Sequence, residues 1–191
     1  RLAWLHSDDT YYPGAISAAV AVLQAHPEVG MVYGDADLPD EAGRVIGRFA
    51  SRQTDYERLL RGSVHIPQAT TFFRTDLWRQ IGPLDLQLFF AFDYNFWVQL
   101  AKISKLHYLP RLWATFRLHR AGKSVRFDDR CYPDMIKVYQ RERGHKLSWL
   151  WLRAKLRRIF YAWLPLRLRL FQLLFQILHI RICIAVPLGF A

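Results

Sequence analysis

Cysteine is scarce in this 191-residue chain, which contains only Cys131 and Cys183. Two cysteines are too few for a framework of several disulfides, and they do not have the spacing of a metal-binding motif. The sequence therefore excludes a disulfide-rich secreted domain and a zinc finger, and it is compatible with a reducing compartment.

Acidic residues are scarce in the C-terminal part. Residues 1–134 contain 16 Lys and Arg against 15 Asp and Glu, whereas residues 135–191 contain 11 Lys and Arg against one acidic residue. The first part has the balanced charge of an ordinary globular domain. The net charge of +11 comes almost entirely from the tail, which needs its own explanation.

A long uninterrupted apolar run is also missing. Apolar residues alternate with Arg and Lys over 148–169, and the mostly apolar residues 170–191 still contain Gln172, Gln176, His179 and Arg181. A spanning helix needs about 20 apolar residues with few charges, and a basic amphipathic stretch lying in the membrane interface fits at least as well. We predict that the tail, residues 147–191, is helical and binds anionic membranes at their cytoplasmic face, without deciding whether it spans them. Clustered Lys and Arg also suit nucleic acid, but the interleaved bulky apolar residues favour a membrane, so no nucleic acid is expected.

The chain begins at Arg1 and enters an apolar segment at once. A domain rarely opens on a central buried strand, so we expect an N-terminal part of the domain to be missing, and no signal peptide is recognisable. Residues 1–146 are long enough for one domain with a core. No internal repeat or low-complexity linker divides them.

Apolar periodicity and turn residues predict alternating strands and helices, typical of an α/β fold. Strands are expected up to residue 7 and over 29–33, 45–46, 68–74, 106–109 and 112–119. Helices are expected over 13–25, 54–61, 75–81, 93–103 and 134–143. Thr54 and Glu57 have the spacing of a capping box.

Two adjacent carboxylates, Asp8 and Asp9, follow the first predicted strand. Ligands of open α/β sheets bind outside the carboxyl ends of the strands, where carboxylates can hold a hard divalent cation together with phosphates. The alternative is that the pair only caps the next helix. Asp35 and Asp37 could also bind a metal, but polar residues at the mouth of a surface hairpin are the favoured interpretation.

Two further segments carry polar groups with a possible chemical role. Asp93 is expected at the start of a helix, where an aspartate is usually a cap. His119 follows the last predicted strand, and Lys123 and Ser124 lie in the loop after it. Taken alone, each of these residues is more often structural than functional.

Together, in this order and spacing, the segments of residues 1–125 resemble the second half of a family 2 glycosyltransferase with a GT-A fold. The resemblance implies a Rossmann-like mixed sheet with helices on both faces. Trp4–Asp9 with Pro13-Gly14 is similar to that family's Trp-Leu-Asn-Ser-Asp-Asp…Pro-Gly segment. Asp93-Tyr94 with Trp97 is similar to its Glu-Asp-Tyr-Asp-Leu-Trp stretch, and residues 119–124 are similar to its Tyr-Arg-x-His…Ser-x-Ser segment.

The resemblance implies inverting transfer of a sugar from a nucleotide-diphosphate sugar to the hydroxyl of a glycan or lipid-linked acceptor, in the synthesis of cell-surface polysaccharide or glycan. It implies Mg²⁺ or Mn²⁺ at Asp9 and Asp8 with His119, and Asp93 as the catalytic base. The remaining implied contacts are those of His119, Lys123 and Ser124 with the donor diphosphate and of Gln68 and Trp97 with the acceptor.

The sequence departs from the family pattern before the Asp pair and before the proposed base. His6 replaces the usual Asn, and Phe92 stands where Glu usually precedes the base, which puts acceptor binding in doubt. The family's first β-α-β segments, which bind the nucleotide, have no counterpart here, so we expect residues 1–191 alone not to turn over a nucleotide sugar. The alternative function is a non-catalytic fragment or a basic module that binds membrane or nucleic acid.

Overall fold

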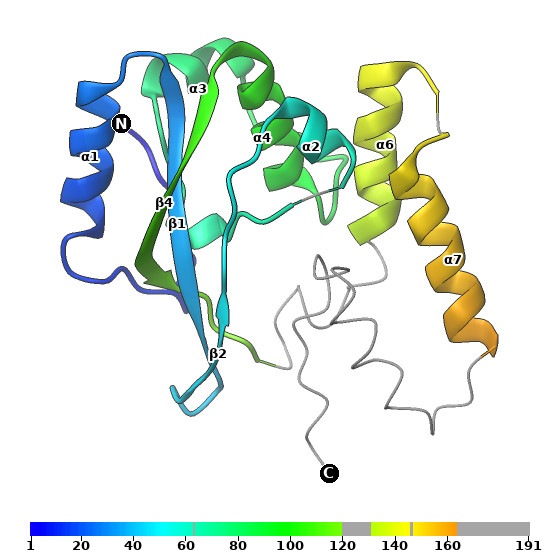
Figure 1. The fold of residues 1–191 in the computed structure, drawn as a ribbon, viewed down its shortest axis with the longest axis horizontal. Coiled ribbons are helices and arrows are strands. Elements are labelled where there is room, and N and C mark those ends of the chain that lie inside the picture. Colours follow the sequence, from blue (N-terminus) through cyan, green and yellow to red (C-terminus); the bar gives the residue numbers. More distant parts are fainter. Residues whose placement is uncertain (63, 120–130, 146, 164–191) are drawn as a thin grey trace.

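The computed structural model describes residues 1–62, 64–119, 131–145 and 147–163, with side chains of the last helix described to residue 156. It is a mixed α/β structure in which helices flank a four-stranded mixed sheet (Figure 1). The predicted fold class is confirmed at this level. In chain order the elements are α1 (Ala15–Ala25), β1 (Val29–Pro39), β2 (Val45–Phe49), α2 (Tyr56–Leu60), the 3-10 helix η1 (Gln68–Thr70), β3 (Phe72–Phe73), α3 (Thr75–Ile81), α4 (Phe92–Ile103), β4 (Lys105–Thr115), α6 (Cys131–Arg143) and α7 (Trp149–Trp163).

Strand β1 is the centre of the sheet and is buried along almost its whole length. Strand β4 runs parallel to it, with partners from Val29 to Asp37. The other edge of β1 is shared, because β3 pairs antiparallel with its beginning and β2 with its end. The carboxyl ends of β1 and β4 therefore lie at the same end of the sheet, at the bottom of Figure 1.

Strand β4 is one irregular strand, so the prediction of two strands interrupted at Pro110 is wrong. Tyr33 of β1 lies opposite Tyr108, but Asp35 lies opposite Leu112, so β4 bulges between these partners. Proline has no backbone donor for the ladder and is tolerated at such bulges. Gly34 accommodates the bulge, because a Cβ there would lie 2.5 Å from the backbone oxygen of Arg111.

The segment before the Asp pair is not the expected buried strand. Leu2 forms one antiparallel bridge with Phe73, and the chain is then irregular up to residue 10. The predicted strand over 68–74 is likewise only η1 followed by the two residues of β3. Period-two patterning could not reveal either departure, because both short segments pair with a single partner over very few residues.

Helices on the two faces of the sheet enclose two hydrophobic clusters. Helix α1 covers one face, where its Leu23 lies in one cluster with Val32 of β1 and Trp113 of β4. Helices α3 and α4 cover the other face with the larger cluster, where Trp4 packs against Phe73 with ring centroids 5.1 Å apart. Figure 1 shows α1 on the opposite side of the sheet from α3 and α4.

Helix α6 contacts the body through the carboxylate of Glu142, among other groups. This carboxylate accepts hydrogen bonds from Tyr56 of α2 at 2.7 Å, from Gln99 of α4 at 2.7 Å and from Lys102 of α4 at 3.0 Å. Burial alone would raise the pKa of Glu142, but these three donors lower it below its usual value. Asp55, not the predicted Thr54, is the cap of α2, since its side chain accepts from the amide of Arg58 at 2.8 Å.

Helix α7 begins where the basic tail begins. The hydroxyl of Ser148 accepts a hydrogen bond from the amide of Trp151 at 3.0 Å, and Leu150 is fully buried in the larger cluster. The first turn of α7 thus packs on the body, while the domain boundary predicted at 146/147 remains a prediction. In the part of the chain that is described, no helix has the length and hydropathy to cross a membrane; residues 164–191 lie outside that part.

Candidate functional site

The Asp8–Asp9 turn is fixed at the carboxyl end of β4 by backbone pairing. The amide of Tyr12 donates to the carbonyl oxygen of Trp113 at 2.9 Å, and the amide of Thr115 donates to that of Thr10 at 2.8 Å. These bonds lay residues 10–12 along the free edge of β4. The Asp pair therefore lies beyond the carboxyl ends of the parallel strands, although no strand leads into it.

Asp9 is buried, with 5% of its surface exposed. Its Oδ1 accepts a hydrogen bond from the amide of Arg117 at 2.9 Å, whereas its Oδ2 is buried without a hydrogen-bond partner among the described residues. Burial raises the pKa of Asp9, the Arg117 amide opposes that rise, and the neighbouring Asp8 carboxylate adds to it. A buried carboxylate oxygen without a donor is costly, and such an atom is commonly satisfied by an ion or water.

Asp8 and His6 complete a compact cluster with Asp9. One ligand atom each from His6, Asp8 and Asp9 lies within 4.8 Å of the others, which is the arrangement of a possible metal site. His6 was expected only as a tolerated replacement for Asn, so its potential as a ligand was missed. The signal was present, because a His-x-Asp-Asp segment places three potential ligands in one turn.

His119 contacts the cluster through Asp8. Its Nε2 lies 3.0 Å from Oδ2 of Asp8, and both side chains are partly exposed. An imidazole that donates to a carboxylate ligand orients it and fixes its charge distribution, as outer partners of metal ligands do. The structure thus joins His119 to the predicted metal residues through Asp8; direct ligation by His119 stays a prediction.

Arg117 clamps the turn and was not recognised in the sequence. Its Nε donates to the backbone oxygen of Asp8 at 3.2 Å and its Nη1 to that of Asp40 at 3.0 Å, while its amide holds Asp9. One residue therefore ties together the Asp turn, the hairpin after β1 and the segment after β4. Its place between β4 and His119 is visible only once the strands are paired.

Asp37 lies inside β1, so its predicted position at the mouth of a surface hairpin is wrong. It is buried, and its two oxygens accept from the hydroxyl of Tyr12 at 2.9 Å and from Nε of Arg48 at 3.2 Å. Asp35 is similarly occupied, by the amide of Ser51 at 2.8 Å and the hydroxyl of Tyr108 at 2.9 Å. These bonds give both carboxylates structural roles within the sheet.

The remaining predicted residues are placed with varying support. Asp93 is the second residue of α4, half-buried, and its Oδ1 accepts from the amide of Tyr94 at 2.7 Å. Gln68 is 5% exposed and donates to the backbone oxygen of Trp4 at 2.7 Å, and Trp97 is 2% exposed. Burial counts against direct acceptor contacts by Gln68 and Trp97, which stay predictions. Lys123 and Ser124 lie outside the described residues.

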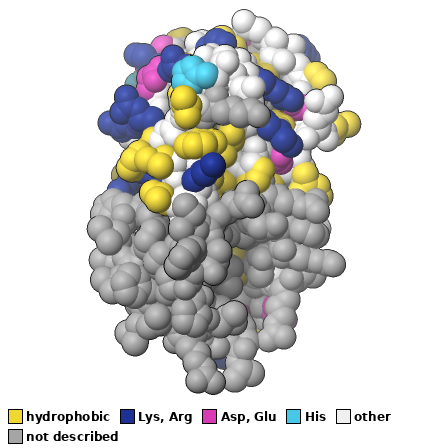
Figure 2. Space-filling model, turned by 90° about the vertical axis from the view of Figure 1, so that its right-hand side faces the viewer, with side chains coloured by type: hydrophobic (Ala, Val, Ile, Leu, Met, Phe, Trp, Pro, Cys, Tyr) yellow, Lys and Arg dark blue, Asp and Glu magenta, His cyan; other side chains and the backbone are white. Residues whose placement is uncertain are grey.

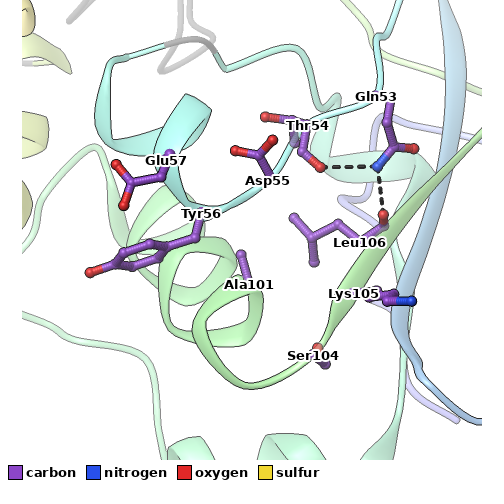
Figure 3. Close-up of a pocket in the computed structure, with 9 residues that line it drawn as sticks. All are labelled: Gln53, Thr54, Asp55, Tyr56, Glu57, Ala101, Ser104, Lys105 and Leu106. Carbon is purple, nitrogen blue, oxygen red and sulfur yellow. Dashed lines mark hydrogen bonds between the residues drawn. The ribbon is translucent and has the colours of Figure 1, made fainter.

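Two hollows occur elsewhere on the described surface. One of about 350 Å³ lies between α2, the end of α4 and the start of β4 (Figure 3). Gln53 is anchored at its wall, donating to the backbone oxygens of Thr54 at 3.0 Å and Leu106 at 2.7 Å. Because Asp55 caps α2 and Glu57 pairs with Arg143, the acidic groups of this hollow already have structural roles. The other hollow is rich in arginine and is described below.

Comparison with known proteins gives one distant match. An uncharacterized glycosyltransferase of Rickettsia prowazekii (strain Madrid E) is 24% identical over 128 residues, which are 62% of this chain and 40% of that protein. The chain is distantly similar to a glycosyltransferase. It spans well under two thirds of that relative, and no model of a known protein family matches it.

Proposed function

We propose that this chain is part of an inverting glycosyltransferase with a GT-A fold of the family 2 type, which uses a nucleotide-diphosphate sugar as donor. The observation that carries the proposal is the buried Asp9, whose Oδ2 lacks a hydrogen-bond partner among the described residues, beside Asp8 and His6 at the carboxyl ends of two parallel strands. The distant similarity to a glycosyltransferase supports the same reaction class.

The residues of the cluster fit a divalent cation. Asp9 and Asp8 offer carboxylate oxygens, which suit Mg²⁺ and Mn²⁺, and His6 adds an imidazole nitrogen, which Mn²⁺ accepts more readily than Mg²⁺. A bound cation would supply charge neutralisation for the diphosphate leaving group. The amide of Arg117 holds the Asp9 carboxylate and its guanidinium holds the backbone oxygen of Asp8, while His119 contacts the Asp8 carboxylate.

The proposed base is Asp93. The amide of Tyr94 donates to its Oδ1, which holds the carboxylate at the positive end of the α4 dipole. In the proposed reaction the acceptor hydroxyl attacks the anomeric carbon, the bond to the nucleoside diphosphate breaks, and Asp93 takes the hydroxyl proton. A weak base is sufficient when the proton leaves as the new bond forms.

We further propose that the acceptor is a glycan or a lipid-linked sugar and that the protein works at the cytoplasmic face of a membrane. The motivation is the basic and apolar C-terminal part, which begins with α7. His119, with Lys123 and Ser124, is proposed to contact the donor diphosphate.

The test is release of nucleoside diphosphate from a panel of UDP-, GDP- and dTDP-sugars by the longest natural protein that contains this chain. Release is expected to require Mg²⁺ or Mn²⁺ and an acceptor, and to stop with a chelator. Turnover that persists in the chelator would contradict the cation assignment. Binding of Mn²⁺ without any donor turnover across the panel would favour the non-catalytic alternative.

A further inference from the structure

A second polar hollow, of about 690 Å³, lies where α7 meets the body. Its lining is Arg52, Gln53, Arg58, Arg61, His65, Trp149 and Arg153. The first five come from α2 and the segments on either side of it, and the last two come from α7. We call this hollow the arginine groove.

The charge of the arginine groove is positive and largely uncompensated. Four of its lining residues are arginines and none is acidic. Arg58 pairs with Asp55 at 3.4 Å, whereas the guanidinium groups of Arg52 and Arg61 are exposed and have no ion-pair or hydrogen-bond partner in the part of the chain that is described. Guanidinium groups gathered in this way suit a phosphate, which accepts several charge-assisted hydrogen bonds at once.

Close packing of α7 on the body forms the groove. Leu150 is buried, and its Cδ1 would lie 2.7 Å from a Cβ placed on Gly62, whose φ is +78°. Only glycine permits this approach, because another residue would meet both the leucine and an unfavourable backbone conformation. The contact brings Trp149 and Arg153 to the groove, and Arg153 stacks over the Trp149 ring at 5.5 Å.

The outward face of α7 beside the groove is apolar. Trp149, Leu152 and Leu156 are 55%, 38% and 50% exposed and lie at helical spacing on the side opposite Leu150. Leu147, just before the helix, is 68% exposed. Figure 2 shows hydrophobic and basic side chains next to one another on this side of the molecule. A helix with such a face, rimmed by Trp and cations, lies in the plane of a membrane interface.

We propose that the arginine groove binds the phosphate of an anionic membrane lipid while the apolar face of α7 enters the interface. The lipid is favoured over a free phosphate because exposed leucines and Trp149 continue directly from the phosphate-binding rim. This site is separate from the Asp8–Asp9 cluster, and its test needs neither donor nor metal, so it stands or fails independently of sugar transfer. It also gives membrane contact to the folded body, through Arg52 and Arg61, and not only to the tail.

The test is co-sedimentation of the full chain with phosphatidylcholine vesicles that contain phosphatidylglycerol. The variant is Arg52→Gln with Arg61→Gln. The matched control is Arg79→Gln with Arg111→Gln, which removes the same charge from exposed arginines of α3 and β4. Each Lys or Arg near an anionic surface contributes about 1 kcal/mol, so the groove variant should bind about 30-fold more weakly.

The control variant is expected to bind like the unmodified chain, and both variants should keep its Tm because the four arginines are exposed. Equal weakening by both variants would show that only the overall charge matters and would overturn the groove. If the groove bound free glycerol 3-phosphate as tightly as it binds the vesicles, so that millimolar glycerol 3-phosphate released the chain from them, the lipid would be overturned as the ligand. Retained binding after Trp149→Ser with Leu152→Ser would overturn the role of the apolar face.

Discussion

Replacing Asp9 by asparagine tests the proposed metal cluster most directly. Asparagine keeps an oxygen that can accept the hydrogen bond of the Arg117 amide, which is 2.9 Å long in the unmodified chain. It removes the negative charge and the second carboxylate oxygen. Because that oxygen is buried without a described hydrogen-bond partner, no existing bond is lost with it. The fold should therefore tolerate the substitution, and the Tm without metal should equal or exceed that of the unmodified chain.

The cost should appear in metal binding. Removal of a mere outer partner of a metal ligand lowers affinity about 10–100-fold, so loss of a charged ligand should lower it by at least about 100-fold, or roughly 3 kcal/mol. The assay is titration of the full chain with Mn²⁺, followed by the electron paramagnetic resonance signal of the free ion, with the Tm measured in parallel.

Asp37→Asn is the matched control. Asp37 is also a buried aspartate at this end of the sheet, but both of its oxygens already accept hydrogen bonds, from Tyr12 and Arg48. Its replacement should leave Mn²⁺ affinity unchanged and lower stability by about 1 kcal/mol. If both variants weakened Mn²⁺ binding equally, or if Asp9→Asn left it unchanged, the cluster would be wrongly assigned.

Three further predictions concern other parts of the chain. Asp93→Asn, made in the longest natural protein that contains this chain, should lower kcat about 10²–10⁴-fold with donor Kd and Tm retained, and a near-normal kcat would exclude Asp93 as the base. Gly62→Ala should destabilise the chain by about 1–3 kcal/mol in urea unfolding, because the new Cβ meets Leu150, and an unchanged midpoint would show that α7 does not need this contact. Glu142 has a lowered pKa in the folded chain, so its contribution to stability is present above its unfolded pKa of about 4.3 and is lost as the pH falls through its folded pKa. Glu142→Gln should therefore reduce the slope of the unfolding free energy against pH between pH 5 and pH 3, about one unit on either side of that pKa. An unchanged slope would refute this account.

Local signals in the sequence were sufficient for most helices and for the central strand. The ends of α1 and α3 follow from His26-Pro27 and Gly82-Pro83, and the burial of β1 follows from its apolar residues. These features depend on neighbours in the chain, so a single sequence contains their causes.

The candidate site was only partly accessible to such reasoning. Asp8 and Asp9 could be recognised as a pair at the end of an apolar segment, and His119 as a polar group after the last strand. The sequence could not show that His119 contacts Asp8, or that Arg117 holds the turn, because each of these contacts joins residues more than 100 positions apart. They follow from the pairing of residues 10–12 with the edge of β4.

Two functional distinctions were decided by the tertiary structure alone. Asp9 and Asp37 are both acidic residues near strand ends in the sequence, but only the packed structure gives Asp37 two donors and leaves one oxygen of Asp9 without a partner among the described residues. Composition determined that the C-terminal part is basic and apolar. Only the docking of Leu150 against Gly62 brings the first turn of α7 to the arginines of the body. A long-range contact, and not local periodicity, fixes where a helix lies on a domain.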